Sequence, residues 1–168
     1  MRSLVFLACA VALGLAACPL AAHDIVRRAG SSLPIASSVL VPAGSDVVFV
    51  GGTLPDAANP AAPAGSAERA GDTAAQAHSV LAKIAAELEA QGFAMSDVVK
   101  MNVFLVGDAN RGGTADYAGL MSAYLKYFAK EKGGLPARTT VQVAGLAVPG
   151  ALVEIEVIAA RGGDHAHN

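Results

Sequence analysis

Residues 72–108, "DTAAQAHSVLAKIAAELEAQGFAMSDVVKMNVFLVGD", predict one helix followed by one strand. Asp72 or Thr73 is placed to cap the helix, and Gly92 ends it just after Gln91. The apolar positions fall at helical spacing on one face: Ala77, Val80, Leu81, Ile84 and Leu88. The strand then alternates, with Val99, Met101, Val103 and Leu105 on one side and Lys100 and Asn102 on the other. An amphipathic helix beside an alternating strand predicts an α+β layer.

The flanking sequence predicts a second helix and five more strands. The helix runs from about residue 115 to 129 and buries Tyr117, Leu120, Tyr124 and Phe128 at helical spacing. Short strands are expected at 24–29, 36–42, 46–51, 138–146 and 152–160, with a turn at 43–45 between the second and third of them. The Ala-, Pro- and Gly-rich residues 55–71 are expected to form a loop without a helix.

Two helices cover only one face of such a sheet. The last two strands are apolar at alternate positions, and the pattern predicts no third helix to shield the second face. Self-association is the economical cover, so we expect an oligomer in which the sheets of several copies meet.

Composition limits the size and the partners of the domain. The chain has 168 residues, a formal net charge of −2, 15% charged residues and a mean hydropathy of +0.47. These values fit one compact domain. No basic stripe is present to bind a phosphate backbone, so nucleic acid is not an expected partner. No phosphate loop, serine nucleophile motif or CxxC pair occurs, and no cofactor is required by the sequence.

The N-terminus has the pattern of an export signal. Residues 1–22 carry one early basic residue, then an apolar run, then small residues. Leu15-Ala16-Ala17-Cys18 resembles a lipoprotein signal, in which Cys18 would carry the lipid and attach the protein to a membrane; the alternative is ordinary cleavage after Ala22. Either route predicts a protein exported to the periplasm or the outer membrane of a bacterium.

The rest of the chain divides simply. Residues 23–161 are expected to form the single domain, and residues 162–168 a flexible tail. Asp164, His165 and His167 could hold a metal, but a tail of this kind is usually unstructured, and no metal site is predicted. His78 is expected at the surface or at the edge of the core.

Arg138 is the most informative single residue. In "EKGGLPARTTVQVAGL" (131–146) it follows a Gly-Gly-Leu-Pro turn and opens a β-branched strand. An arginine there either caps the sheet or pairs with a local carboxylate, or its planar fork of donors holds a carboxylate ligand. Position alone leaves both readings open.

Residues 71–108 together with "LPARTTVQVAGLAVPGALVEIEVIAA" (135–160) resemble the reactive intermediate deaminase family, the YjgF-type (RidA) proteins that hydrolyse enamines and imines. The resemblance covers about residues 34 to 160. It implies a chorismate-mutase-like fold, a six-stranded mixed sheet with two helices on one face, and a homotrimer in which the sheets form a barrel and the clefts lie between subunits.

The resemblance also implies a site. Arg138 falls on the family's carboxylate-binding arginine, Glu154 on its glutamate near the attacking water, and Glu156 on the next acid of that strand. Gly51 and Thr53 fall on substrate-binding positions. Glu154 and Glu156 should share one face of their strand, opposite Val153, Ile155 and Val157.

The chain departs from the family pattern around this site. Ile35 stands where a tyrosine is usual, Gly51-Gly52-Thr53 stands for Ser-Gly-Gln, and Met121 stands for an asparagine. One extra residue precedes Glu154, which could shift the register of its strand. The resulting prediction is a deaminase of 2-enamino and 2-imino acids, with a non-catalytic small-carboxylate-binding module as the alternative.

Overall fold

The fold was analysed in a computed structural model, which describes residues 24–30, 33–128 and 134–163. The elements are β1 (Val26–Ala29), β2 (Ala36–Leu40), β3 (Asp46–Thr53), α1 (Ala67–Ala70), α2 (Thr73–Ala90), β4 (Val98–Val106), α3 (Tyr117–Tyr124), β5 (Ala137–Val143) and β6 (Val153–Arg161). The strands form one sheet in the order β1-β2-β5-β4-β6-β3. β5 runs parallel to both β2 and β4, and the other pairs are antiparallel, so the predicted six-stranded mixed sheet is confirmed.

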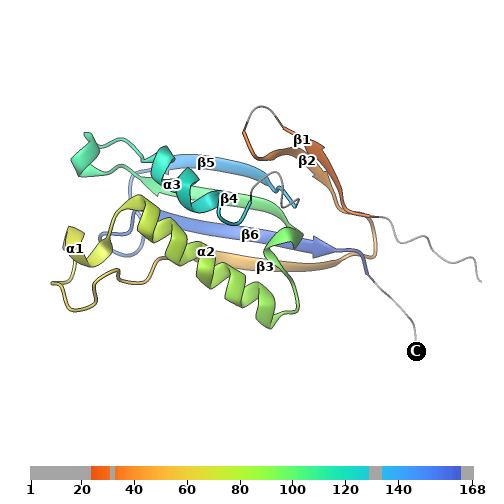
Figure 1. Cartoon of the computed structure of the whole chain (residues 1–168), viewed down its shortest axis with the longest axis horizontal. Coiled ribbons are helices and arrows are strands. Elements are labelled where there is room, and N and C mark those ends of the chain that lie inside the picture. The colour runs from red at the N-terminus through yellow and green to blue at the C-terminus, as the bar shows by residue number, and fades with distance from the viewer. Residues whose placement is uncertain (1–23, 31–32, 129–133, 164–168) are drawn as a thin grey trace, which may run out of the picture.

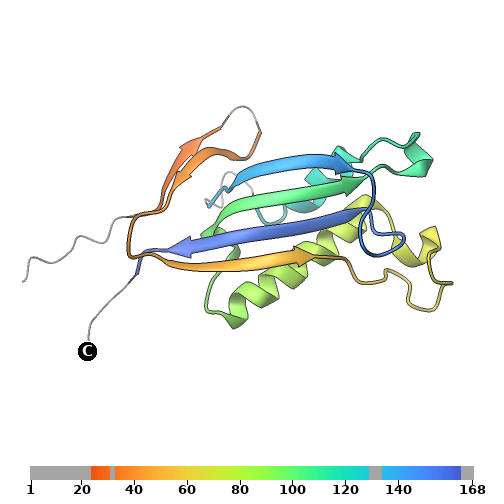
Figure 2. The same cartoon turned by 180° about the vertical axis from the view of Figure 1, so that it is seen from behind.

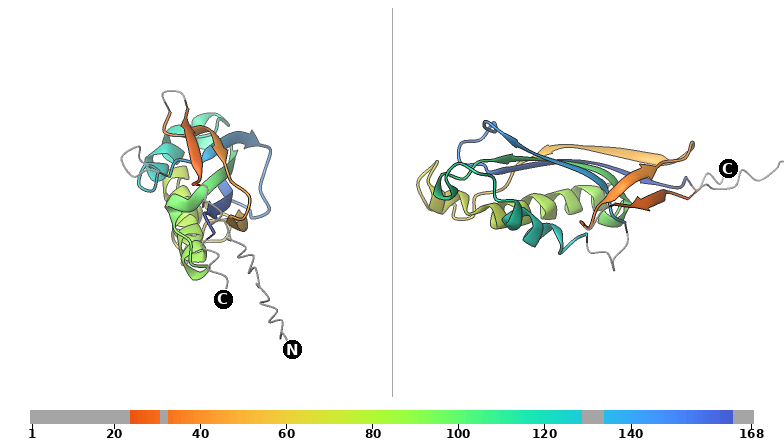
Figure 3. Two further views of the ribbon diagram at one scale, coloured as in Figure 1. Left: turned by 90° about the vertical axis from the view of Figure 1, so that its right-hand side faces the viewer. Right: turned by 90° about the horizontal axis from the view of Figure 1, so that it is seen from above.

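Both long helices lie on one face of the sheet (Figures 1 and 3). The whole predicted apolar stripe of α2 is buried, as are the alternating apolar residues of β4. Asp72 caps α2 by accepting a hydrogen bond from the Ala75 amide at 2.8 Å. The core between helices and sheet therefore follows the hydrophobic pattern of the sequence.

One predicted turn was confirmed and two other local predictions were wrong. Residues 43–45 form the predicted turn between β2 and β3, although these strands are not neighbours: β2 pairs with β1, and β3 pairs with β6 at the other edge. The segment 55–71 contains the one-turn helix α1, capped by the Ser66 hydroxyl. Tyr117, predicted to be buried, is 47% exposed at the first position of α3.

The ends of the elements also differ from the prediction. Helix α3 ends at Tyr124 rather than near residue 129, although Phe128 beyond it is buried as expected. Strand β5 ends at Val143 and β2 at Leu40, both earlier than the apolar pattern suggested. Strand ends are poorly specified by sequence, since a strand stops where its neighbour stops.

The second face of the sheet carries no helix in the described chain, and the sheet does not close on itself (Figure 2). Phe49 on this open face is 75% exposed, and Val47 and Val141 are also exposed. An apolar face of this kind is the surface that the sequence predicted to be covered by other copies.

The predicted signal residues 1–22 with Cys18, and the histidines of the C-terminal tail, lie outside the described residues. Among the residues that are described, no helix has the length and apolarity needed to cross a bilayer.

Candidate functional site

Arg138 lies at the start of β5 and points toward α3. Its neighbour in the sheet is Met101, which is fully buried on the helix side. The guanidinium carbon lies 4.3 Å from the centre of the Tyr124 ring, and Nη1 is 3.3 Å from Sδ of Met121. The Tyr124 hydroxyl donates to the Pro34 carbonyl at 2.9 Å, so the ring beneath the arginine is itself held in place.

The surroundings of Arg138 are only partly polar. Burial lowers the pKa of Arg138, with Tyr124 acting in the opposite direction, and burial raises the pKa of Tyr124 to about 12 against the effect of Arg138. Within the described residues, no carboxylate lies within 4.0 Å of the guanidinium. Two positions along the strand, the buried Thr140 hydroxyl also has no hydrogen-bond partner in this part of the chain. Arg138 is thus a positioned cation that no acid of the described residues neutralises.

Glu154 and Glu156 share one face of β6, as predicted, and it is the open face of the sheet; the apolar residues that alternate with them are buried on the helix side, namely Val153, Ile155 and Val157. Glu156 accepts a hydrogen bond from Nδ2 of Asn102 at 2.7 Å and lines a shallow cavity of about 180 Å³ beside Phe49 and Lys100. Glu156 is therefore engaged within the chain.

Gly51, Gly52 and Thr53 form a bulge against β6. Val50 pairs with Val157 and Thr53 pairs with Ile155, so three steps on β3 match two on β6. A Cβ atom built on Gly52 would overlap Oε1 of Glu154, which means that the carboxylate lies directly against the bare backbone. The Thr53 hydroxyl donates to the Gly51 carbonyl at 3.1 Å. The bulge brings the two predicted binding residues, Gly51 and Thr53, beside the Glu154 strand and not beside Arg138.

Arg138 and Glu154 are separated within one chain. Arg138 faces the helices, whereas Glu154 lies on the open face opposite Phe104. Arg138 is level with Met101 and Val157, which is three residues, or about 10 Å, along the sheet from Glu154, and β4 lies between their strands. One copy of the chain does not bring these two groups to the same substrate, so a joint site would need a second copy.

Gln76 holds the connection that leads into β6. Its side chain is buried, and Nε2 donates to the carbonyls of Gly150 at 3.0 Å and Gly71 at 3.3 Å. Its Oε1 accepts from the Leu152 amide at 2.7 Å. These bonds fix the loop that leads into β6, and the bonded Leu152 amide lies two positions before Glu154.

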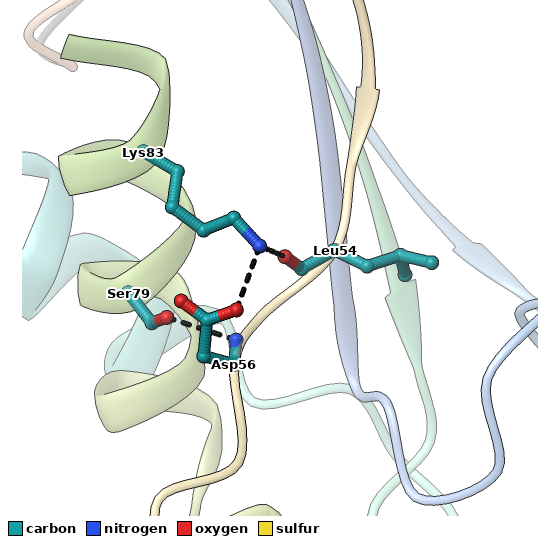
Figure 4. Close-up of polar contacts among 4 residues, drawn as sticks. All are labelled: Leu54, Asp56, Ser79 and Lys83. Atoms are coloured by element: carbon teal, nitrogen blue, oxygen red, sulfur yellow. Dashed lines mark hydrogen bonds and ion pairs between the residues drawn. The ribbon is translucent and has the colours of Figure 1, made fainter. Parts of the chain in front are cut away.

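A second group of contacts holds the chain that leaves β3 (Figure 4). Nζ of Lys83 donates to the Leu54 carbonyl at 3.0 Å and pairs with Asp56 at 2.8 Å. The Ser79 hydroxyl accepts from the Asp56 amide at 3.0 Å. The exit from the bulge is therefore fastened to α2.

Sequence reasoning missed three contributors to this region. Tyr124 was predicted only as core, although its ring also supports Arg138. Gln76 lies on the buried face of α2, and a polar residue at an apolar position was the available signal for its role. The contact between Gly52 and Glu154 had no sequence signal beyond the paired glycines. Among the residues described, no three His, Cys, Asp or Glu side chains converge as metal ligands would.

Together these features define an α+β protein with one helix-covered sheet face, one open face and an arginine that is stacked on Tyr124 without an acid partner among the described residues. The model of the Endoribonuclease L-PSP family matches residues 32–161. The chain belongs to this family, which confirms the resemblance to YjgF-type proteins.

Individual relatives agree with this assignment. The RutC family protein PH0854 of Pyrococcus horikoshii is 40% identical over 89 residues, which span 53% of this chain and 63% of that relative. TdcF of E. coli, solved with bound serine, is 30% identical, with a TM-score of 0.54 over 79% of this chain and 92% of TdcF. NMB1025 of Neisseria meningitidis, a member of the YjgF protein family, is 25% identical, with a TM-score of 0.52 over 83% of this chain and 97% of that one.

Proposed function

We propose that the protein hydrolyses reactive 2-enamino and 2-imino acids to 2-keto acids and ammonia. The observation that carries this proposal is Arg138, a cation stacked on Tyr124 with no acid partner among the described residues. A bidentate arginine would bind the carboxylate that all these substrates share and fix their orientation. TdcF, with its bound serine, is a relative that holds an α-amino acid, and this supports the same class of ligand here.

The chemistry needs a positioned base and water. A 2-enamino acid first tautomerises to the 2-imino acid, taking up a proton at its β-carbon and losing one from its nitrogen. Water then adds to the carbon of the C=N bond, the adduct loses ammonia, and the carbonyl of the 2-keto acid forms. Glu154 would accept a proton from the attacking water and return it to the departing nitrogen. Hydrolysis consumes only water, so the proposal includes no cofactor.

The separation of Arg138 from Glu154 makes the proposed site a shared one. We place Arg138 from one copy and Glu154 from a neighbouring copy at the same cleft, with Gly51 and Thr53 beside that glutamate. Proteins of this family are typically homotrimers, and the exposed Phe49 on the open face supports the same assembly for this chain. Export and attachment through a lipid on Cys18 remain part of the proposal.

The alternative is a non-catalytic module that binds a small carboxylate. It is favoured by the location of Arg138 and Glu154 on opposite faces, because binding needs only the first of them. The family description names an endoribonuclease, but the net charge of −2 supports a small ligand over RNA.

The test uses purified protein lacking residues 1–22, with imines generated by an amino-acid oxidase and semicarbazide trapping the imine that survives. Faster imine loss is expected, and Arg138→Ala and Glu154→Gln should each reduce it by at least about 100-fold. Arg161→Ala is the matched control, because Arg161 also stacks on an aromatic ring, Phe93 at 4.6 Å, but at the far end of β6.

Each result separates the two functions. Arg138-dependent acceleration supports the deaminase. Carboxylate binding that depends on Arg138, without faster imine loss, would reject the deaminase and support the non-catalytic binding module. Equal loss of activity in Arg138→Ala and Arg161→Ala would point to general destabilisation and would reject Arg138 as the clamp that binds the substrate carboxylate.

A further inference from the structure

An apolar stripe runs along one side of α3, next to the side that packs on the sheet. Tyr117, Met121 and Leu125 follow one another at four-residue spacing, so they share one side of the helix. Tyr117 is 47% exposed and Leu125 is 45% exposed, while Met121 is half-buried between them. Met121 packs against the edge of the core, so the exposed parts of the stripe are the side chains of Tyr117 and Leu125.

Arg138 lies against the middle of the stripe. Its Nη1 is 3.3 Å from the Met121 sulfur, and the same guanidinium is stacked on the Tyr124 ring. A thioether is a weak acceptor, so this contact leaves the cation's demand for an anion largely unmet. The two groups that contact the guanidinium on the helix side, the Met121 thioether and the face of the Tyr124 ring, are both largely apolar.

The β2–β5 junction adds another apolar group on the same side. Ala36 pairs with Ala137, so the residues adjacent to this pair, Ile35 and Arg138, both point to the opposite face of the sheet. Ile35, just before β2, packs against the helix-side core, which is also the side of Arg138. The nearby polar residues of α3 are used locally, since the Ser122 hydroxyl donates to the Gly119 carbonyl at 2.8 Å.

We infer that the stripe Tyr117–Met121–Leu125 is the side-chain subsite of the Arg138 clamp, and that the preferred substrates are 2-imino acids with apolar side chains of three or more carbons. This inference rests on the proposed function for the identity of the reacting group. A ligand is the occupant that the charges favour. An apolar protein surface over the stripe would remove water from the Arg138 guanidinium without supplying an anion, which is costly. A ligand with a carboxylate would pair with the guanidinium while its side chain covers the stripe.

The test measures binding apart from turnover. Stable 2-keto acids, pyruvate and 4-methyl-2-oxopentanoate, are titrated calorimetrically into the purified protein. Each of the three added carbons is worth about fourfold when fully buried and about twofold on a half-exposed stripe, so the larger acid should bind roughly tenfold more tightly. Tyr117→Ser and Met121→Asn should each reduce this ratio by about twofold to threefold, and Met121→Leu should retain it.

The outcomes distinguish this inference from the proposed function. Preferential binding of the larger acid without imine hydrolysis would leave the subsite standing and reject the deaminase. Equal, Arg138-dependent binding of both acids would overturn the subsite alone, as would an unchanged ratio in both polar variants. A Tyr117→Ser protein that dissociates in sedimentation experiments with its ratio unchanged would assign the stripe to a subunit contact. Absence of any Arg138-dependent binding would reject the clamp and the subsite together.

Discussion

Replacing Gln76 by leucine tests whether the loop before β6 is held by this single side chain. Leucine is close in volume and suits a buried position on a helix, so packing is largely retained. The Leu152 amide and the Gly150 carbonyl lose partners at 2.7 and 3.0 Å, and the Gly71 carbonyl loses a weaker one at 3.3 Å. The change therefore removes hydrogen bonds with little change in shape.

The cost follows from those three contacts. Each lost bond that leaves a buried group unpaired costs about 1–1.5 kcal/mol, and the long bond to Gly71 costs less, so the sum is about 3 kcal/mol. For a domain of this size, about 3 kcal/mol corresponds to a fall in Tm of roughly 10 °C. Leucine at Gln76 should also loosen the start of β6, because the amide two positions before Glu154 loses its acceptor.

Urea unfolding at a fixed protein concentration measures the free energy, since dissociation of an oligomer would make the midpoint depend on concentration. Gln91→Leu is the matched control: it lies at the end of the same helix, is exposed, and should change stability by less than about 0.5 kcal/mol. Faster amide exchange at Leu152 should accompany the loss in Gln76→Leu. A loss below about 1 kcal/mol, or equal losses in the two variants, would refute the reasoning.

Three further predictions concern the site and the anchor. Gly52→Ala should displace the flexible Glu154 carboxylate, reducing kcat/KM by about 10- to 100-fold with little change in the urea midpoint; unchanged turnover would remove Glu154 from the proposed mechanism. The folded chain holds the Tyr124 proton to about pH 12, against about 10 when unfolded, so this contribution to stability is intact below pH 10 and up to about 3 kcal/mol is lost as the pH rises toward 12. Tyr124→Phe should flatten that alkaline loss in urea titrations, and a parallel decline in both proteins would contradict the assignment. Cys18→Ser should move the protein from the membrane fraction to the soluble fraction, and a variant that stays with the membranes would exclude the lipid anchor.

Much of the fold was predictable because its signals are periodic and local. The stripe of α2 and the alternation in β4 specified which residues are buried, and the structure agrees residue by residue. The pairing of β1 with β2, and of β3 with β6, was not predictable, since strands that look alike in sequence can pair in several orders. Tyr117 was also misassigned. Its spacing matched that of the buried residues of α3, but spacing alone does not show whether the first turn of a helix is covered.

The candidate site divides along the same line. The sequence alone determined Arg138 as a cation at the start of a strand, and Glu154 and Glu156 as acids sharing one face, because alternation along a single strand is a local property. Only the tertiary structure decided that Arg138 and Glu154 lie on opposite faces of the sheet, that Tyr124 supports the arginine, and that the α3 stripe adjoins it. Those relations join segments far apart in the chain, and they depend on strand order, register and helix docking, which are set by packing the whole core at once.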